Sequence, residues 1–270
     1  MGHGLFPSGH PLLDTYLDGG FRRGQLHEIF AGDADDNGSA AGLAAMLALC
    51  ALPPGKDILW LRTLDAPRRG GRFNPAGLAE LGGNPASLLM AVAPDDTALL
   101  RCAAEALRCD GFGAVIAECW GAPCVLDLTA SRRLTLAANL AGVTAFLLRL
   151  DAQEQPSTAD TRWSVRSAPS TPLAANAPGY PALDITLLRR RAGRSGESWR
   201  VEWDRDRRIF RETQAAAGTG GLHSDGHNDS ENGAENGTGA AGGGAPLPGA
   251  VVPLPARQPL EPGRRIKRRA

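Results

Sequence analysis

A strand–loop–helix–strand unit near the start of the chain limits the possible folds most strongly. Residues 25–30 and 57–61 have the composition of short strands, and the alanine- and leucine-rich residues 40–52 between them are predicted to form a helix. The same alternation continues with predicted helices over residues 95–108 and 131–141. Further strands are predicted over residues 87–92, 114–117, 144–150, 162–166, 184–189 and 198–203. This order predicts an α/β fold with a mostly parallel central sheet flanked by helices and a late antiparallel flank.

The composition changes sharply after Thr213. Residues 214–249 are mostly Gly, Ala, Asn, Ser and acidic residues, and prolines follow them. A segment without large side chains has no burial to offset the entropy that it would lose on ordering. The chain then ends in a basic cluster of Arg264, Arg265, Lys267, Arg268 and Arg269. We predict three regions: a folded domain over residues 1–211, a disordered linker over residues 212–262 and a basic C-terminal tail over residues 263–270.

Composition and charge exclude several classes of protein. The formal net charge of the 270 residues is zero, so the chain as a whole lacks the basic excess of many nucleic-acid and membrane binders. The N-terminus has no signal-peptide pattern, and no run approaches the roughly 18 apolar residues of a membrane span. The five cysteines lie in or beside apolar segments, which predicts reduced core cysteines in a cytosol. Cys119 and Cys124 have no second pair at zinc-ligand spacing, so we predict a cytoplasmic protein without a metal site.

The loop between the first predicted strand and its helix has the outline of a phosphate-binding loop. A working loop, G-x-x-x-x-G-K-[ST], supplies backbone N–H groups, a lysine for the terminal phosphates and a hydroxyl for magnesium. Counting from Gly32, the second glycine falls at Asn37, the lysine at Gly38 and the hydroxyl at Ser39. Moving the register by one residue corrects the glycine but puts Ser39 where the lysine belongs. Neither register supplies a lysine.

Three aspartates, Asp33, Asp35 and Asp36, lie where a phosphate would bind. Two unit charges about 4 Å apart interact by roughly 4 kcal/mol at an effective dielectric constant near 20. Several such repulsions exceed what the loop N–H groups could recover, so we predict that the loop binds no nucleotide. From these residues alone, a degenerate nucleotide-binding loop and an ordinary strand-to-helix turn are equal alternatives.

The residues around the loop favour the first alternative. Those ahead of it resemble the start of the RecA recombinase core, and they are Ser8-Gly9, Leu13-Asp14, Leu17, Gly19-Gly20-Phe21, Gly24 and Glu28-Ile29. Residues 58–61 then match the RecA strand that carries a catalytic glutamate, and residues 114–118 match the Walker B strand. Residues 187–191 match a late strand that ends in paired basic residues.

The resemblance extends to ImuA, a family of RecA-like proteins of bacterial damage-induced mutagenesis operons. The segments that carry it span nearly all of residues 5–205 and do not include the tail. They are LWLRTLDA, RFNPAGLAELGGNPASLLM, LDLTASRRLTLAANLAGVTAFLLR, TRWSV, LLRRRAG and WRVEWD.

By this resemblance the domain is a RecA-like core that has lost its ATPase. The strand-end glutamate position falls on Leu64, or on Asp65 in an alternative alignment, and the Walker B carboxylate is Glu118. The implied vestigial loop consists of Gly32, Asp33, Asp35, Asp36, Asn37, Gly38 and Ser39. The resemblance implies no catalytic residue, no cofactor and no metal ion.

Contacts with DNA or with proteins are predicted elsewhere on the chain. The segment that follows residues 144–150 carries three acids and no base, a poor match to a phosphate backbone. Arg189 and Arg191 end a predicted strand, and they are candidate contacts to a partner or to DNA, or a solvated strand end. The tail residues 264–269 can bind DNA or an acidic partner surface through the linker.

Two further pairs of residues are interpreted from their positions. Arg132 and Arg133 on the predicted helix are expected to make structural contacts. Trp163 and Trp203 are predicted to be core residues that also lie at an interface.

The leading hypothesis is a non-catalytic RecA-fold adaptor, a pseudo-ATPase of the SOS response. By the resemblance it would support error-prone translesion synthesis with ImuB, a polymerase-related protein, and an error-prone C-family polymerase, and it would also touch RecA. Such a protein would be cytoplasmic and nucleoid-associated. Two alternatives are a DNA-dependent ATPase that uses Glu118 and an arginine, and a cell-division inhibitor like SulA.

Overall fold

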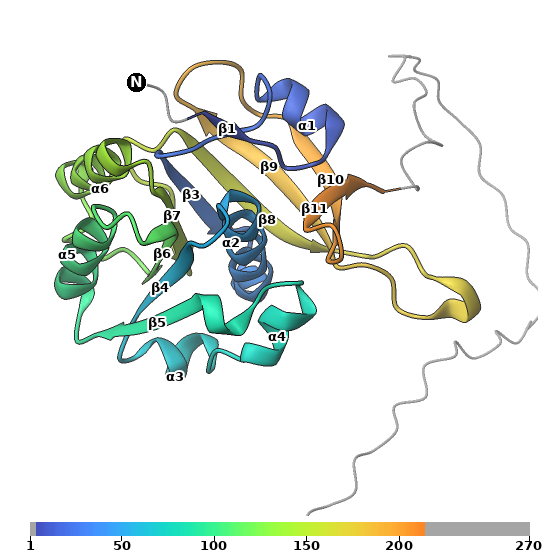
Figure 1. Cartoon of the computed structure of the whole chain (residues 1–270), viewed down its shortest axis with the longest axis horizontal. Helices are drawn as coiled ribbons and strands as arrows, with labels where there is room; N and C mark the ends of the chain where they lie inside the picture. The colour runs from blue at the N-terminus through green and yellow to red at the C-terminus, as the bar shows by residue number, and fades with distance from the viewer. Residues whose placement is uncertain (1–3, 214–270) are drawn as a thin grey trace, which may run out of the picture. The chain divides into compact units, whose positions relative to one another are not determined.

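A nine-stranded sheet forms the centre of the protein, whose computed structural model describes residues 4–213 (Figure 1). In sheet order the strands are β11 (Ile209–Glu212), β10 (Ser198–Asp204), β9 (Ala182–Arg190), β8 (Thr161–Ala168), β3 (Leu26–Ala31), β7 (Thr144–Leu150), β6 (Phe112–Trp120), β4 (Asp57–Thr63) and β5 (Leu88–Ala93). Neighbours from β8 to β5 pair in parallel, and neighbours from β8 to β11 pair antiparallel. This confirms the predicted mostly parallel sheet with a late antiparallel flank.

Helices cover both faces of the sheet. Helix α2 (Asn37–Ala51) lies on one face, and α5 (Asp96–Ala106) and α6 (Leu128–Ala141) lie on the other (Figure 1). Successive residues of a strand point to opposite faces, so Trp60 of β4 packs in the α2 layer and Leu61 packs in the α5–α6 layer. The two hydrophobic cores are therefore built from alternate residues of the same strands.

Short elements that the sequence did not reveal complete the domain. They have between two and six residues, too few for a detectable periodicity. They are β1 (Leu5–Phe6), α1 (Pro11–Tyr16), β2 (Phe21–Arg22), η1 (Ala34–Asp36), α3 (Ala66–Gly70), α4 (Pro75–Glu80), η2 (Pro85–Ser87) and η3 (Ala174–Asn176). β1 pairs antiparallel with β2, and the chain between β8 and β9, which includes η3, projects away from the sheet (Figure 1).

The RecA-like residues ahead of the loop have a clear structural role. The carboxylate of Asp14 in α1 accepts hydrogen bonds from the backbone N–H groups of Ser8 and Gly9, at 2.8 and 2.9 Å. Gly20 has a φ of +123°, and a Cβ at this position would lie 2.4 Å from the carbonyl oxygen of Phe6. Glycine is therefore required where the chain turns from α1 into β2.

Two tryptophans are core residues as predicted, but the expectation that they also lie at an interface is wrong. Trp163 and Trp203 have 0% exposed surface, so neither lies at an interface. The indole N–H of Trp163 donates to the Thr161 hydroxyl at 2.8 Å, and that of Trp203 donates to the Leu81 carbonyl at 3.0 Å. Each indole finds its polar partner inside the core.

The cysteine prediction is only partly correct. All five cysteines are free thiols, as expected. Cys119 is buried and Cys50 is partly buried, but Cys102, Cys109 and Cys124 are exposed and are not core residues. Cys102 lies within α5, Cys109 follows that helix and Cys124 precedes α6, so an apolar neighbourhood in sequence did not mean burial at these positions.

The predicted linker and basic tail lie outside the described residues, apart from residues 212 and 213. Within residues 4–213, none of the helices is both long and apolar enough to cross a membrane.

Candidate functional site at the carboxyl edge of the sheet

The loop of residues 32–39 joins β3 to α2 through the short 3-10 turn η1. Its first glycine, Gly32, follows the end of β3 and is held against the sheet, because its N–H donates to the carbonyl of Val165 on β8 at 2.7 Å. Asp36 is buried, and its carboxylate accepts hydrogen bonds from the backbone N–H and the hydroxyl of Ser167, at 2.8 and 3.1 Å. A carboxylate therefore fastens the loop to β8 and stands at the amino end of α2.

The other side chains of the loop offer little to an anion. Asp33 forms an ion pair with Arg166 at 3.6 Å, and both side chains are more than half exposed, so the pair adds little stability. The amide oxygen of Asn37 accepts the N–H of Asp151 at 3.4 Å. Asp35 is exposed beside them, and residues 38 and 39 belong to the first turn of α2. That this loop is a degenerate nucleotide-binding loop stays a prediction.

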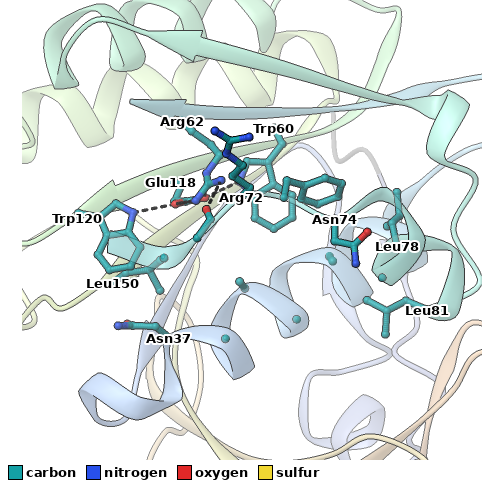
Figure 2. A pocket seen from close by; sticks show the side chains of 18 residues that line it. Asn37, Trp60, Arg62, Arg72, Asn74, Leu78, Leu81, Glu118, Trp120 and Leu150 are labelled. Atoms are coloured by element: carbon teal, nitrogen blue, oxygen red, sulfur yellow. Dashed lines mark hydrogen bonds and ion pairs between the residues drawn. The ribbon is translucent and has the colours of Figure 1, made fainter. Parts of the chain in front are cut away.

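Glu118 lies near the carboxyl end of β6, and both of its oxygens are occupied (Figure 2). The indole N–H groups of Trp60 and Trp120 donate to it at 2.9 and 2.8 Å, one to each oxygen. The guanidinium of Arg62 on β4 lies against the same two oxygens, with Nη2 at 2.9 Å from Oε1 and Nε at 2.8 Å from Oε2. Arg62 also donates to the carbonyl of Gly71 at 3.0 Å.

This arrangement limits what Glu118 can do chemically. Its side chain is 3% exposed and that of Arg62 is 9% exposed, so the ion pair is almost completely removed from water. A divalent cation at this carboxylate would have to displace the arginine and compete with both indole donors. Within residues 4–213, no group of three or more His, Cys, Asp or Glu side chains is placed to hold a metal ion.

The partners of Glu118 were not predicted from the sequence. Trp60 and Arg62 are two residues apart on β4, and Glu118 and Trp120 are two residues apart on β6, so each pair points to one face of the sheet. The register of these parallel strands pairs residue 60 with Ile116, which brings residue 62 next to Glu118. An arginine inside an otherwise apolar strand was the one available signal, because such a charge needs a buried partner.

A cavity of about 360 Å³ opens beside this cluster and beside the loop (Figure 2). One wall is the start of α2, where small residues such as Gly38, Ala41 and Gly42 leave room. The opposite wall includes Phe73 and Leu78 from the segment that contains α4. The cavity is at the lower end of the usual range for ligand sites, and its walls are mainly apolar, which suits an apolar group better than a triphosphate.

The other acidic candidate at the strand ends, Asp65, is a surface residue that begins α3. Its carboxylate accepts the Thr63 hydroxyl at 2.5 Å and forms an ion pair with Arg69 at 3.1 Å. The hydrogen bond from Thr63 lowers the pKa of Asp65, and Arg69 adds to this effect. Leu64, the residue at the glutamate position of the first alignment, is 67% exposed and carries no acid. Neither alignment therefore places a carboxylate that is free of protein partners at this strand end.

Comparisons with known proteins identify the family. No protein-family model matches the chain. Protein ImuA of Caulobacter vibrioides, in two strains, is 32% identical over 203 residues, which cover 70% of this chain and 79% of the relative. The chain belongs to the ImuA family. The crystal structure of the RadB recombinase is similar in fold, with a TM-score of 0.53 and 15% identity, over 78% of this chain and 100% of that one. The fold is therefore RecA-like, as the resemblance implied.

The strand-end arginines of this ImuA-family chain fall into two classes. Arg189 and Arg191 are exposed. Arg189 donates to the carbonyl of Ser157 at 2.9 Å, and Arg191 directly follows the end of β9. Arg190, between them, donates to the Tyr16 and Leu17 carbonyls at 2.9 and 3.0 Å and anchors α1. Arg190 is therefore structural, and the roles of the other two as contacts stay predictions.

The acidic segment after β7 packs against the domain. Glu154 forms an ion pair with Arg162 at 3.0 Å, and Arg162 also contacts the buried Glu28 of β3 at 2.9 Å. Arg149 lies 4.0 Å from Glu28, and burial lowers the pKa of this arginine although Glu28 opposes the shift. The sequence did not predict this buried charge cluster, because its members come from three strands that are adjacent only in the folded sheet. The basic tail residues Arg264, Arg265, Lys267, Arg268 and Arg269 lie outside the described residues.

Proposed function

We propose that this chain is a non-catalytic adaptor in damage-induced mutagenesis. Membership of the ImuA family supports the link to mutagenesis, and the RecA-like fold supports a link to DNA damage. The observation that carries the non-catalytic part is the engagement of both Glu118 oxygens by Arg62, Trp60 and Trp120. In this proposal the RecA-like core presents surfaces to partner proteins and uses neither nucleotide nor metal.

The physical argument concerns what nucleotide binding would require. Phosphoryl transfer in P-loop enzymes depends on a lysine at the phosphates and on a metal held by a hydroxyl and a carboxylate. The loop of residues 32–39 has no lysine, and the nearby carboxylate Glu118 is already neutralised. Removing one partner of a buried ion pair costs about 3–5 kcal/mol, which a metal ion at this site would have to offset.

The proposed partners follow from the family. An ImuB-like, polymerase-related protein and an error-prone C-family polymerase would bind the adaptor, and RecA would be a further contact. Arg189, Arg191 and the basic tail are the proposed contact residues, the tail acting on DNA or on an acidic surface. The proposed location is the cytoplasm, in association with the nucleoid.

A binding experiment with purified proteins tests the proposal. Full-length protein and a version that ends at Thr213 are each passed over the immobilised ImuB-like protein, the immobilised polymerase and immobilised RecA of the same bacterium. We expect the full-length protein to be retained by one of them; loss of binding on truncation would place the contact in the tail, and retention would place it in the core. Failure of both versions to bind either protein or RecA would contradict the adaptor role.

The atypical-ATPase alternative is separated from this proposal by calorimetry. It requires Glu118 and an arginine to act on nucleotide, and Arg62 is the arginine that contacts Glu118. We expect no heat of binding when magnesium and ATP are titrated into the protein. ATP hydrolysis that disappears in Glu118→Gln would show that the protein is an enzyme and contradict the adaptor proposal. Inhibition of FtsZ polymerisation would support a division inhibitor in its place.

A further inference from the structure

Helix α6 exposes leucines on the side that faces away from the sheet. Its buried side already supplies Leu134, Ala137 and Ala138 to the core. On the outer side, Leu136 is 54% exposed and Leu140, one turn further on, is 79% exposed. An ordinary surface helix has one apolar stripe and a polar opposite face. Leu136 and Leu140 therefore form an exposed apolar pair that the folding of this domain does not use.

A groove lies between α5 and α6, and Arg133 in its lining is three residues before Leu136 and seven before Leu140, on the same face of α6. It encloses about 560 Å³, and Leu100 and Ala104 of α5 and Leu134 of α6 supply apolar parts of its lining. Val125, just before α6, lies at the groove and is 37% exposed. Helices α5 and α6 lie on the face of the sheet opposite α2 (Figure 1), so the groove between them is separate from the cavity beside Glu118.

Arginines without acidic partners border the groove and the leucines. Arg101 of α5 and Arg133 of α6 line the groove, and neither has an ion pair or hydrogen bond within residues 4–213. Arg132 is exposed in the same way, which corrects the expectation that Arg132 and Arg133 make structural contacts. The acids nearby are already engaged: Glu105 binds Arg108 at 2.8 Å, and Asp127 caps α6 by accepting the N–H of residue 130 at 2.7 Å.

We propose that the α5–α6 groove and the adjoining leucines bind an acidic amphipathic helix of a protein partner. The arginines lack counter-charges, so the occupant must carry carboxylates. Exposed leucines gain nothing from a phosphate backbone, whereas the apolar face of a helix buries them. Leu136 and Leu140 are one helical turn apart, the spacing at which residues of a second helix can pack between them. The inference goes beyond the adaptor proposal, since it names a surface and a partner chemistry that hold whichever protein supplies the helix.

The test compares three fluorescent probes in anisotropy titrations with the full-length protein. The first is a peptide of about 18 residues, or about five helical turns, with leucines one turn apart and glutamates on the flanks. The second is the same peptide with lysine in place of glutamate, and the third is an oligothymidylate of the same length. We expect the acidic peptide to bind at least about tenfold more tightly than the lysine peptide.

Paired substitutions locate the binding. Arg101→Glu with Arg133→Glu, and separately Leu136→Ser with Leu140→Ser, are each expected to weaken binding of the acidic peptide about tenfold. The matched control is Leu64→Ser with Arg68→Glu, which changes an exposed leucine and an exposed arginine near α3 and is expected to leave binding unchanged. The basic tail also attracts an acidic probe, but every variant keeps the tail. The difference in affinity between variants therefore reports binding at α5 and α6. Thermal melting of every variant checks that it is folded.

Several outcomes would overturn the inference. Equal binding of the two peptides, or unchanged binding in both α5–α6 variants, would mean that the surface does not select an acidic helix. Oligothymidylate binding that is lost in these variants would make the groove a nucleic-acid site. Self-association that disappears in Leu136→Ser with Leu140→Ser, measured by sedimentation, would show that a second copy covers the leucines. None of these results bears on retention by the ImuB-like protein, so the two proposals fail separately.

Discussion

Replacing Glu118 by glutamine tests whether this carboxylate is a structural partner of Arg62 or an unused catalytic group. The substitution keeps the shape of the side chain and removes its charge, which leaves the guanidinium of Arg62 buried without a counter-ion. It also replaces one acceptor oxygen by an NH₂ donor, which cannot accept the indole N–H or the guanidinium N–H that Glu118 accepts.

The expected loss follows from the burial of the pair. Breaking one side of a buried ion pair costs about 3–5 kcal/mol. For a domain of 150–250 residues, each 1 kcal/mol lowers Tm by about 2–4 °C, so a loss of about 4 kcal/mol corresponds to roughly 8–16 °C. Urea denaturation followed by tryptophan fluorescence, with Trp60 and Trp120 in contact with Glu118, measures this directly. The matched control is Glu105→Gln, whose exposed pair with Arg108 is expected to contribute less than about 1 kcal/mol.

A double-mutant cycle separates the pair from its surroundings. Arg62→Met alone leaves Glu118 buried without its cation, whereas Arg62→Met with Glu118→Gln removes both charges. We expect the double variant to lose less stability than the sum of the two single losses, by a coupling energy of about 2–3 kcal/mol. If Glu118→Gln destabilises by less than about 1 kcal/mol, or if the single losses add, then Glu118 is not held by Arg62 and the structural interpretation is wrong.

Three further perturbations have defined outcomes. Burial lowers the pKa of His27 below its ordinary value of 6.5, so folding disfavours its protonation. The free energy of unfolding is therefore expected to fall as pH drops below about 6.5, by up to about 1.4 kcal/mol per pH unit, and the fall is expected to be smaller in His27→Gln. Burial opposes the charge of Glu202, but the hydrogen bonds that it accepts outweigh burial and lower its pKa below 4.5. The stability that Glu202 contributes is present above that pH and lost below it. In urea denaturation at different pH values, Glu202→Gln is therefore expected to reduce the loss of stability at acid pH. Gly82 has a φ of +80°, and a Cβ there would lie 2.2 Å from the Arg205 carbonyl oxygen. Gly82→Ala is expected to lower the free energy of unfolding, measured in urea, by more than about 1 kcal/mol. The control Gly77→Ala, which has open space around it, is expected to cause no loss.

The sheet was predictable because its strands and helices carry strong local signals. The strand over residues 144–150 has the same bounds in the prediction and in the structure, since a mostly apolar run between a glycine turn and a polar segment allows few alternatives. β11, which has four residues, and β1, which has two, gave no such signal. Their formation depends on partners distant in sequence, such as the pairing of β11 with β10.

The site was less predictable because its geometry depends on the register between strands. The position of Glu118 near a strand end follows from the sequence, but its neutralisation by Arg62 follows only when β4 and β6 are paired. The same limit applies to Asp36, whose hydrogen bond with Ser167, a residue 131 positions away, was not predicted from the sequence. Composition identified which residues were unusual, and the pairing of the strands decided what they contact.

An arginine beside the strand-end carboxylate changes how this fold can be stabilised. A carboxylate at the carboxyl edge of a parallel sheet is ordinarily neutralised by a ligand, and a ligand at a hundred times its Kd adds about 2.7 kcal/mol to the stability of the folded state. Here Arg62 supplies the positive charge from the neighbouring strand, so neutralisation does not depend on any ligand concentration. A magnesium–nucleotide complex would first have to break a buried pair at a cost of about 3–5 kcal/mol, which would weaken its binding by roughly two to four orders of magnitude. Saturating magnesium and ATP are therefore expected to leave Tm unchanged. A rise in Tm of roughly 5–11 °C would show that a ligand displaces Arg62 from Glu118.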